Sequence, residues 1–208
     1  MRFLLFVEGH TEKQGVAAFV KRWLDAQRLQ HVGVTPVNFK GSGRFVEDAP
    51  AKAEARLTER RANEVIAIIG LLDLYGLPDG YEQGITADER YEFAKQKIEQ
   101  RVAQPRYRQF FAVHETEAWL LSDPGVFPRQ VQPVINRLSA RPERVNFDEP
   151  PATRLRAEYR RTLNREYKKP VDGPNLLRKL DPDTAAQKCP YLKQMLDEML
   201  ELAREAGL

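Results

Sequence analysis

Two acidic residues stand where predicted strands end, and carboxylates in that position could hold a metal ion. Glu8 closes the apolar run that starts at Arg2, and Asp73 closes the most apolar run of the chain, 65–73. In an open α/β sheet, ligands gather at the carboxyl ends of the strands, so residues far apart in sequence can meet there. Carboxylates that meet repel each other unless a cation neutralises them, and Mg²⁺ combines carboxylates with water and phosphate oxygens. The pair therefore predicts a Mg²⁺ (or Mn²⁺) site, although each acid could instead cap a helix or lie solvated in a loop.

The segments around these acids predict a doubly wound, mostly parallel α/β sheet. Strand-like runs alternate with segments of helical length, and connections of that length join parallel strands. The run 65–73 is apolar on both faces, as expected for a central strand covered by helices on either side. Pro36 places the second strand at an edge of the sheet. The predicted strands are 2–7, 32–39, 65–73 and 107–113, and the predicted helices between them are 11–28, 46–61 and 86–102.

After residue 115 the pattern changes to short helices separated by prolines. The Asp181-Pro182 and Cys189-Pro190 pairs each have the form of a cap followed by proline in the first helical turn. A chain of 208 residues accommodates one α/β domain with a helical appendix. We therefore expect an α/β core over 1–123 and a helical extension over 124–208 that packs on the core.

The composition narrows the setting in which the protein works. No apolar run approaches the roughly 20 residues of a membrane span, so we expect no membrane association. Cys189 is the single cysteine, which excludes an internal disulfide and a cysteine-based zinc cluster and fits a cytoplasmic location. The net charge of +3 is too small to indicate nucleic-acid binding by itself, so local clusters of charge have to be considered.

Several motifs resemble those of TOPRIM domains, the fold shared by topoisomerases, primases and the overcoming-lysogenisation-defect nucleases. Residues 6–12 resemble the signature Val-Glu-Gly-x-Thr-Glu, in which Glu8 matches the family's glutamate. Residues 72–78 fall where those domains carry Asp-x-Asp, and they are similar to the version in a bacterial TOPRIM-like family, domain of unknown function 4276. Further motifs of that family follow in order at 114–124, 142–146 and 189–192.

This resemblance implies a TOPRIM-like (Rossmann-like) sheet and a Mg²⁺-dependent phosphodiesterase, a nuclease, that acts in DNA defence or repair. DNA ranks ahead of RNA as the expected substrate, and a partner protein encoded nearby is a further expectation. Two alternatives stay open at this point. One is a nucleic-acid-binding or regulatory module without turnover, and the other is a phosphohydrolase or nucleotidyl-transfer enzyme for small molecules.

Tyr75 replaces the second acid of Asp-x-Asp, so another acid has to supply the missing ligand. Glu115 and Glu117 follow the predicted strand 107–113 and would stand at the same edge of the sheet. Residues two apart on a helix point about 200° away from each other, so we expect only one of them to face the site, and Glu115 is nearer the strand end. Glu12 could bind a water held by the metal, although an acid in the first turn of a helix is also favourable on electrostatic grounds.

A basic stretch over residues 151–170 predicts contact with phosphates. Its arginines and lysines outnumber its acids, and the interleaved Tyr159 and Tyr167 would suit stacking on bases. The same charges would also suit a solvated helix with paired side chains. TOPRIM nucleases use a lysine near the metals; this resemblance points to Lys168 or Lys169, with Lys168 as the catalytic candidate. The candidate nucleic-acid-binding residues are Arg160, Arg161, Lys168 and Lys169, together with Lys40 and Arg44 in a glycine-containing loop.

Two histidines and one tyrosine complete the candidates. His10 adjoins the turn after the first strand and could touch a phosphate or a metal. His114 lies beside Glu115 and could orient a water or a carboxylate, although a histidine at a strand end is more often simply hydrogen-bonded in place. Tyr75 could act as a catalytic tyrosine, as in topoisomerases, but the rest of a gate domain is missing from the sequence.

Overall fold

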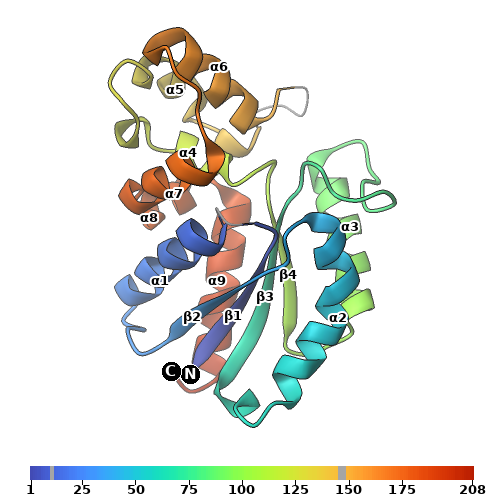
Figure 1. Cartoon of the computed structure of the whole chain (residues 1–208). Coiled ribbons are helices and arrows are strands. Elements are labelled where there is room, and N and C mark those ends of the chain that lie inside the picture. Colours follow the sequence, from blue (N-terminus) through green and yellow to red (C-terminus); the bar gives the residue numbers. More distant parts are fainter. Residues whose placement is uncertain (10–11, 145–148) are drawn as a thin grey trace.

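The computed structural model describes residues 1–9, 12–144 and 149–208 of the chain. Its centre is a sheet of four strands: β1 (Arg2–Val7), β2 (Gly33–Asn38), β3 (Val65–Asp73) and β4 (Tyr107–Ala112). All neighbouring pairs are parallel, and the strand order is β2-β1-β3-β4 (Figure 1). The carboxyl ends of all four strands therefore lie along one edge of the sheet.

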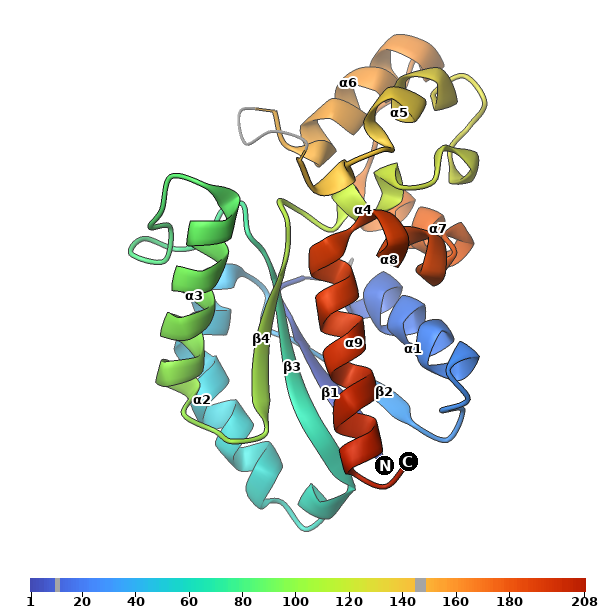
Figure 2. The same cartoon turned by 180° about the vertical axis from the view of Figure 1, so that it is seen from behind.

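Helices cover both faces of this sheet (Figures 1 and 2). Side chains of β1 alternate between the two layers, with Leu5 in one buried cluster and Phe6 in the other. Coverage on both sides explains why the central strands are apolar along their whole length. One face carries α1 (Ala17–Ala26) and α9 (Pro190–Glu205), and the other carries α2 (Ser42–Thr58) and α3 (Ala87–Val102).

The remaining helices gather beyond the carboxyl ends of the strands (Figure 1). They are α4 (Glu117–Leu121), α5 (Gln132–Leu138), α6 (Pro151–Leu163), α7 (Lys169–Lys179) and α8 (Pro182–Lys188), with short turns at Ala62–Glu64, Pro124–Val126 and Pro142–Arg144. The chain then returns along the sheet through α9, which contacts β3 and β4. Within the described residues, none of these helices combines the length and hydropathy that a bilayer crossing requires.

The predicted α/β fold is confirmed, and its local signals explain several boundaries. The strand with Pro36 is an edge strand, where a missing N–H is tolerated. Thr86 and Glu89 exchange side-chain and backbone hydrogen bonds at the start of α3, which explains why the helix predicted over 86–102 begins there. The start of α2 differs from the predicted one: the helix already begins at Ser42, and Gly41 before it adopts a φ of 134° that turns the chain directly into the helix.

Gly70 in β3 provides a test of the packing beneath the site. A Cβ at this position would overlap the Tyr107 hydroxyl and the Gln109 side-chain oxygen, both of which lie across the glycine. We expect Gly70→Ala to lower the free energy of unfolding by about 2 kcal/mol, because the buried neighbours cannot move aside. Urea denaturation measures this change.

Gly43→Ala is the matched control for that substitution. Gly43 lies in the first turn of α2, with no atom within 4 Å of the added methyl group. Alanine should therefore leave stability unchanged or raise it by about 0.5 kcal/mol. Equal effects of the two substitutions would contradict the packing assigned to Gly70.

Candidate metal centre

Glu8 and Asp73 meet at the carboxyl edge of the sheet, on neighbouring strands. Val7 pairs with Leu71, so the residue after Val7 stands beside the end of β3. Asp73 in turn pairs with Ala112 of β4, which brings the segment after β4 to the same edge. The topology thus places three chain segments around one point.

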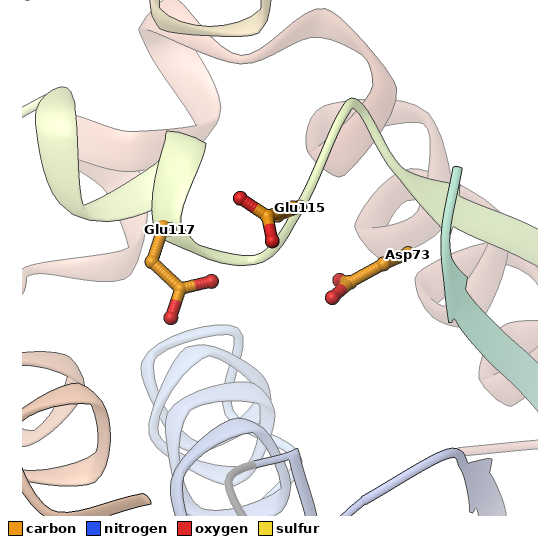
Figure 3. Close-up of side chains that lie close together, drawn as sticks. All are labelled: Asp73, Glu115 and Glu117. Carbon is orange, nitrogen blue, oxygen red and sulfur yellow. The ribbon is translucent and has the colours of Figure 1, made fainter. Parts of the chain in front are cut away.

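Three carboxylates converge at that point, from Asp73, Glu115 and Glu117. One oxygen from each lies within 4.8 Å of the others, and Figure 3 shows the three side chains turned toward one another. The expectation that only one of the two glutamates faces the site is wrong. Helix α4 begins at Glu117, so Glu115 lies before the helix and the angle between helical residues does not apply. The three acids could together hold a metal ion.

Lys169 reaches into this acid cluster. Its Nζ lies 2.7 Å from Asp73 Oδ2, 2.9 Å from Glu117 Oε2 and 3.9 Å from Glu115 Oε1. The choice of Lys168 as the lysine beside the acids is therefore wrong. Lys168 is the exposed N-cap residue of α7, and the helix begins one residue later and directs Lys169 inward.

Hydrogen bonds from three different elements hold the acids in place. The backbone N–H of Thr116 donates to Asp73 Oδ1 at 3.0 Å. The backbone N–H of Ala152, in the first turn of α6, donates to Glu115 Oε2 at 2.9 Å. The buried Tyr167 hydroxyl donates to Glu117 Oε1 at 3.1 Å. The helices beyond the sheet therefore orient the carboxylates.

Burial and mutual repulsion raise the pKa of two acids at this edge. The pKa of Glu115 rises to about 7, first because of burial and then because of Glu117, while Lys169 opposes the rise. The pKa of Glu8 is also raised, by burial first and by Asp73 second. Both shifts show that this edge of the sheet disfavours additional negative charge unless a cation is present.

A cleft of about 810 Å³ opens onto the acids. Glu8, Asp73, Glu115 and Lys169 line it, and Tyr75 lines it with 46% of its surface exposed. Glu8 therefore shares the cleft, although it lies outside the cluster of three carboxylates. Lining residues that the sequence did not single out for the site include Gln14 and Arg156.

Two arginines of the basic stretch form ion pairs, as the alternative of a solvated helix with paired side chains predicts. Arg160 pairs with Glu166, and Arg161 pairs with Glu158, all on the surface. Lys40 and Arg44 are exposed beyond the end of β2.

The two tyrosines of this stretch do not lie on its surface. Tyr159 and Tyr167 are only 1% and 2% exposed, so the prediction that they stack on bases is wrong. They occupy the apolar face of a helix and the core beneath it, which is the ordinary reason for aromatic residues at such positions.

The remaining candidates from the sequence are His10, Glu12 and His114. His10 lies outside the described residues. Glu12 begins a π-helical turn, Glu12–Val16, that leads into α1. His114 is buried, and burial together with the nearby Arg90 lowers its pKa to about 4.

The fold and the site together define the class of this protein. It is an α/β protein whose parallel sheet carries, at its carboxyl edge, an acidic cluster able to hold a metal ion. The chain belongs to the family described as Domain of unknown function (DUF4276), whose profile matches residues 7–200. The family resemblance inferred from the motifs is thereby confirmed.

Solved structures with a similar arrangement of elements include two C-terminal regions of OLD proteins. That of Burkholderia pseudomallei has 18% sequence identity and a TM-score of 0.48, covering 98% of this chain and 97% of the other. That of Xanthomonas campestris pv. campestris has 15% identity and a TM-score of 0.45, covering 100% and 97% respectively. No curated protein matches the sequence.

The role of Lys169 can be tested by removing its charge. Lys169→Met would leave the carboxylates without their cation, and we expect a loss of about 3 kcal/mol in the free energy of unfolding in EDTA. Mn²⁺ should recover much of that loss, because it would replace the missing positive charge. Urea denaturation at pH 8 with and without Mn²⁺ provides the measurement. Lys168→Met is the matched control, and an equal loss there would contradict the assignment.

The raised pKa of Glu115 predicts a pH-dependent metal affinity. A ligand carboxylate must lose its proton before it binds a cation, so affinity should rise as the pH increases toward 7. We expect about a tenfold gain per pH unit below pH 7, with a plateau above it. Mn²⁺ titrations between pH 5.5 and 8.5 would show this. In Glu115→Gln the rise over this interval should be absent, and a profile identical to that of the unaltered chain would argue against Glu115 as a ligand.

Proposed function

We propose that this protein is a metal-dependent phosphodiesterase that cleaves nucleic acid, with Mg²⁺ or Mn²⁺ as its cofactor. The observation that carries the proposal is the convergence of Asp73, Glu115 and Glu117 within 4.8 Å, beside a cleft that Asp73, Glu115 and Lys169 line. The cluster lies at the carboxyl edge of the sheet, where ligands of α/β proteins bind.

The residues present fit a hard divalent cation. Carboxylate oxygens are the ligands that Mg²⁺ and Mn²⁺ prefer, and three of them come from two segments that the fold fixes in place. A cation bound there would act as a Lewis acid on a phosphate oxygen. Asp73, Glu115 and Glu117 are the proposed ligands, and Glu8 faces the same cleft from the neighbouring strand.

The chain's own groups would position the substrate and handle protons. Lys169 carries a flexible ammonium group that can turn from the acids to a phosphate oxygen entering the cleft. Arg156 lines the cleft and offers a second cation to the phosphates. Glu115, with a pKa of about 7 in the metal-free site, would give up its proton when it binds the cation.

A polymeric substrate is favoured over a small one by the distribution of charge around the cleft. Arg156 belongs to α6, and the same helix carries Arg160 and Arg161 on its exposed surface. A strand bound in the cleft could continue along this helix, where its phosphates would compete with Glu158 and Glu166 for the arginines. We place DNA ahead of RNA as the substrate.

Substitution of the acids tests the proposal. Asp73→Asn and Glu117→Gln should each reduce Mg²⁺- or Mn²⁺-dependent cleavage of plasmid and single-stranded DNA by at least about 100-fold, because each removes an anionic ligand at nearly constant volume. Glu8→Gln should also reduce cleavage. Asp79→Asn and Glu82→Gln, exposed acids of the loop after β3, serve as matched controls and should retain full activity.

The possible results separate the three functions considered. Cleavage that persists in Asp73→Asn would exclude this site as its source. Binding of DNA or RNA without any cleavage in Mg²⁺ or Mn²⁺ would favour a binding module. Hydrolysis of small phosphodiesters to phosphomonoesters and alcohols, or release of phosphate from small phosphomonoesters, with intact DNA and RNA, would favour an enzyme of small molecules.

A further inference from the structure

A second cavity, of about 740 Å³, borders the segment that follows β4. His114 lines this cavity, whereas the next residue, Glu115, lines the metal-site cleft. The other walls come from three segments: 85–88 at the start of α3, 141–144, and 188–191 at the start of α9. The last two contain motifs that the proposed cleavage chemistry does not use, at 142–146 and 189–192. The volume suits a small organic ligand.

Three cationic side chains line the cavity, from Arg141, Arg144 and Lys188. Both arginines are exposed, and a guanidinium group binds phosphate through two parallel N–H donors. Lys188 donates to the backbone oxygen of Ser122 at 2.6 Å and has two further N–H donors. Together these groups make the wall suited to an anion.

The acids of the same cavity are engaged in holding its walls. Glu143 is 5% exposed and accepts hydrogen bonds from the backbone N–H groups of Tyr191 and Leu192, at 3.0 and 3.3 Å. Its burial also raises its pKa to about 8, which reduces its negative charge at neutral pH. Asp88 accepts a hydrogen bond from the Tyr191 hydroxyl. The positive charges of the cavity therefore outweigh the negative ones.

The cavity also has an apolar side. Ile85 is 92% exposed, an unusual position for a large aliphatic side chain, and it lines the cavity with Pro190 and Tyr191. The ring of Tyr191 is stacked on Tyr91, with 4.8 Å between ring centroids, so its orientation is fixed. A flat, partly apolar group such as a nucleobase could pack against these side chains.

We propose that this cavity is a nucleotide-binding site, in which Arg141, Arg144 and Lys188 bind the phosphate while Ile85 and Tyr191 contact the base. The ligand is either a free mononucleotide or the phosphorylated end of a strand, since both present a phosphate joined to a base. This site goes beyond the proposed cleavage function, because it uses neither the acid cluster nor a metal.

Binding measurements on the full chain in EDTA test the site without any cleavage. The probes are adenosine 5′-monophosphate, adenosine, inorganic phosphate, and a short single-stranded DNA with and without a 5′-phosphate. The Arg141→Gln/Arg144→Gln variant should bind the phosphorylated probes at least about tenfold more weakly, because two charged hydrogen-bond donors are lost. The matched control is Arg129→Gln/Arg204→Gln, which removes two exposed arginines elsewhere and should bind as the unaltered chain does.

A further variant separates the two halves of the ligand. Ile85→Ser should weaken binding of the mononucleotide but not of inorganic phosphate, because only the base contact is lost. Binding of the free mononucleotide would identify a soluble ligand, and binding of the phosphorylated DNA alone would identify a strand end. Equal binding of adenosine 5′-monophosphate and adenosine together with equal binding of DNA with and without its 5′-phosphate, equal binding by the two double variants, or failure of all probes to bind would overturn the proposal.

The acid cluster provides an independent check. Asp73→Asn should bind the phosphorylated probes as the unaltered chain does, since its carboxylate lies in the other cleft. The two proposals can therefore be tested separately. Loss of cleavage with retained nucleotide binding would show that the substitution affects the metal centre and not the second site. Loss of binding in Asp73→Asn would overturn the second site.

Discussion

The arrangement of this protein depends on one electrostatic constraint, the placing of three carboxylates side by side away from bulk water. Repulsion between Asp73, Glu115 and Glu117 would push them apart or force protons onto them, unless cationic groups and N–H donors compensate. Lys169 supplies the charge, and the donors come from the start of α4, the start of α6 and the segment before α7. The helices beyond the sheet thus stabilise the three carboxylates at this edge. This is a structural role for the proline-rich half of the chain.

The sheet and the position of its acids could be predicted because they depend on local patterns. The apolar run that ends at Asp73, and the edge position of the strand with Pro36, both follow from burial and from the missing proline N–H. The parallel order then brings Glu8 and Asp73 to one edge without any long-range information. The start of a helix can be predicted in the same way where a capping residue such as Thr86 is present, because capping is a contact between residues three positions apart.

The rest of the site depends on boundaries that differ by one residue and on tertiary contacts. Glu115 can face the acid cluster together with Glu117 because α4 starts only at Glu117. Which of Lys168 and Lys169 points toward the acids depends on the residue at which α7 starts. At both starts the side chain of the N-cap residue makes no capping hydrogen bond, so that residue carries no signal of its own in the sequence. Tyr159 and Tyr167 look like base-stacking residues among arginines, but their burial is determined by helices that the sequence does not place relative to one another.

The return of α9 to the sheet has a consequence for how the chain matures as it leaves the ribosome. All four strands are complete at Ala112, yet part of the face formed by β3 and β4 stays uncovered until Met195, Leu196 and Met199 of α9 have been synthesised. Apolar surface exposed on a nascent chain invites aggregation or capture by chaperones. The metal centre has the same delay, since Lys169 and the donors of α6 and Tyr167 emerge after the strands. The acidic edge is therefore assembled late, by the same C-terminal half that closes the core.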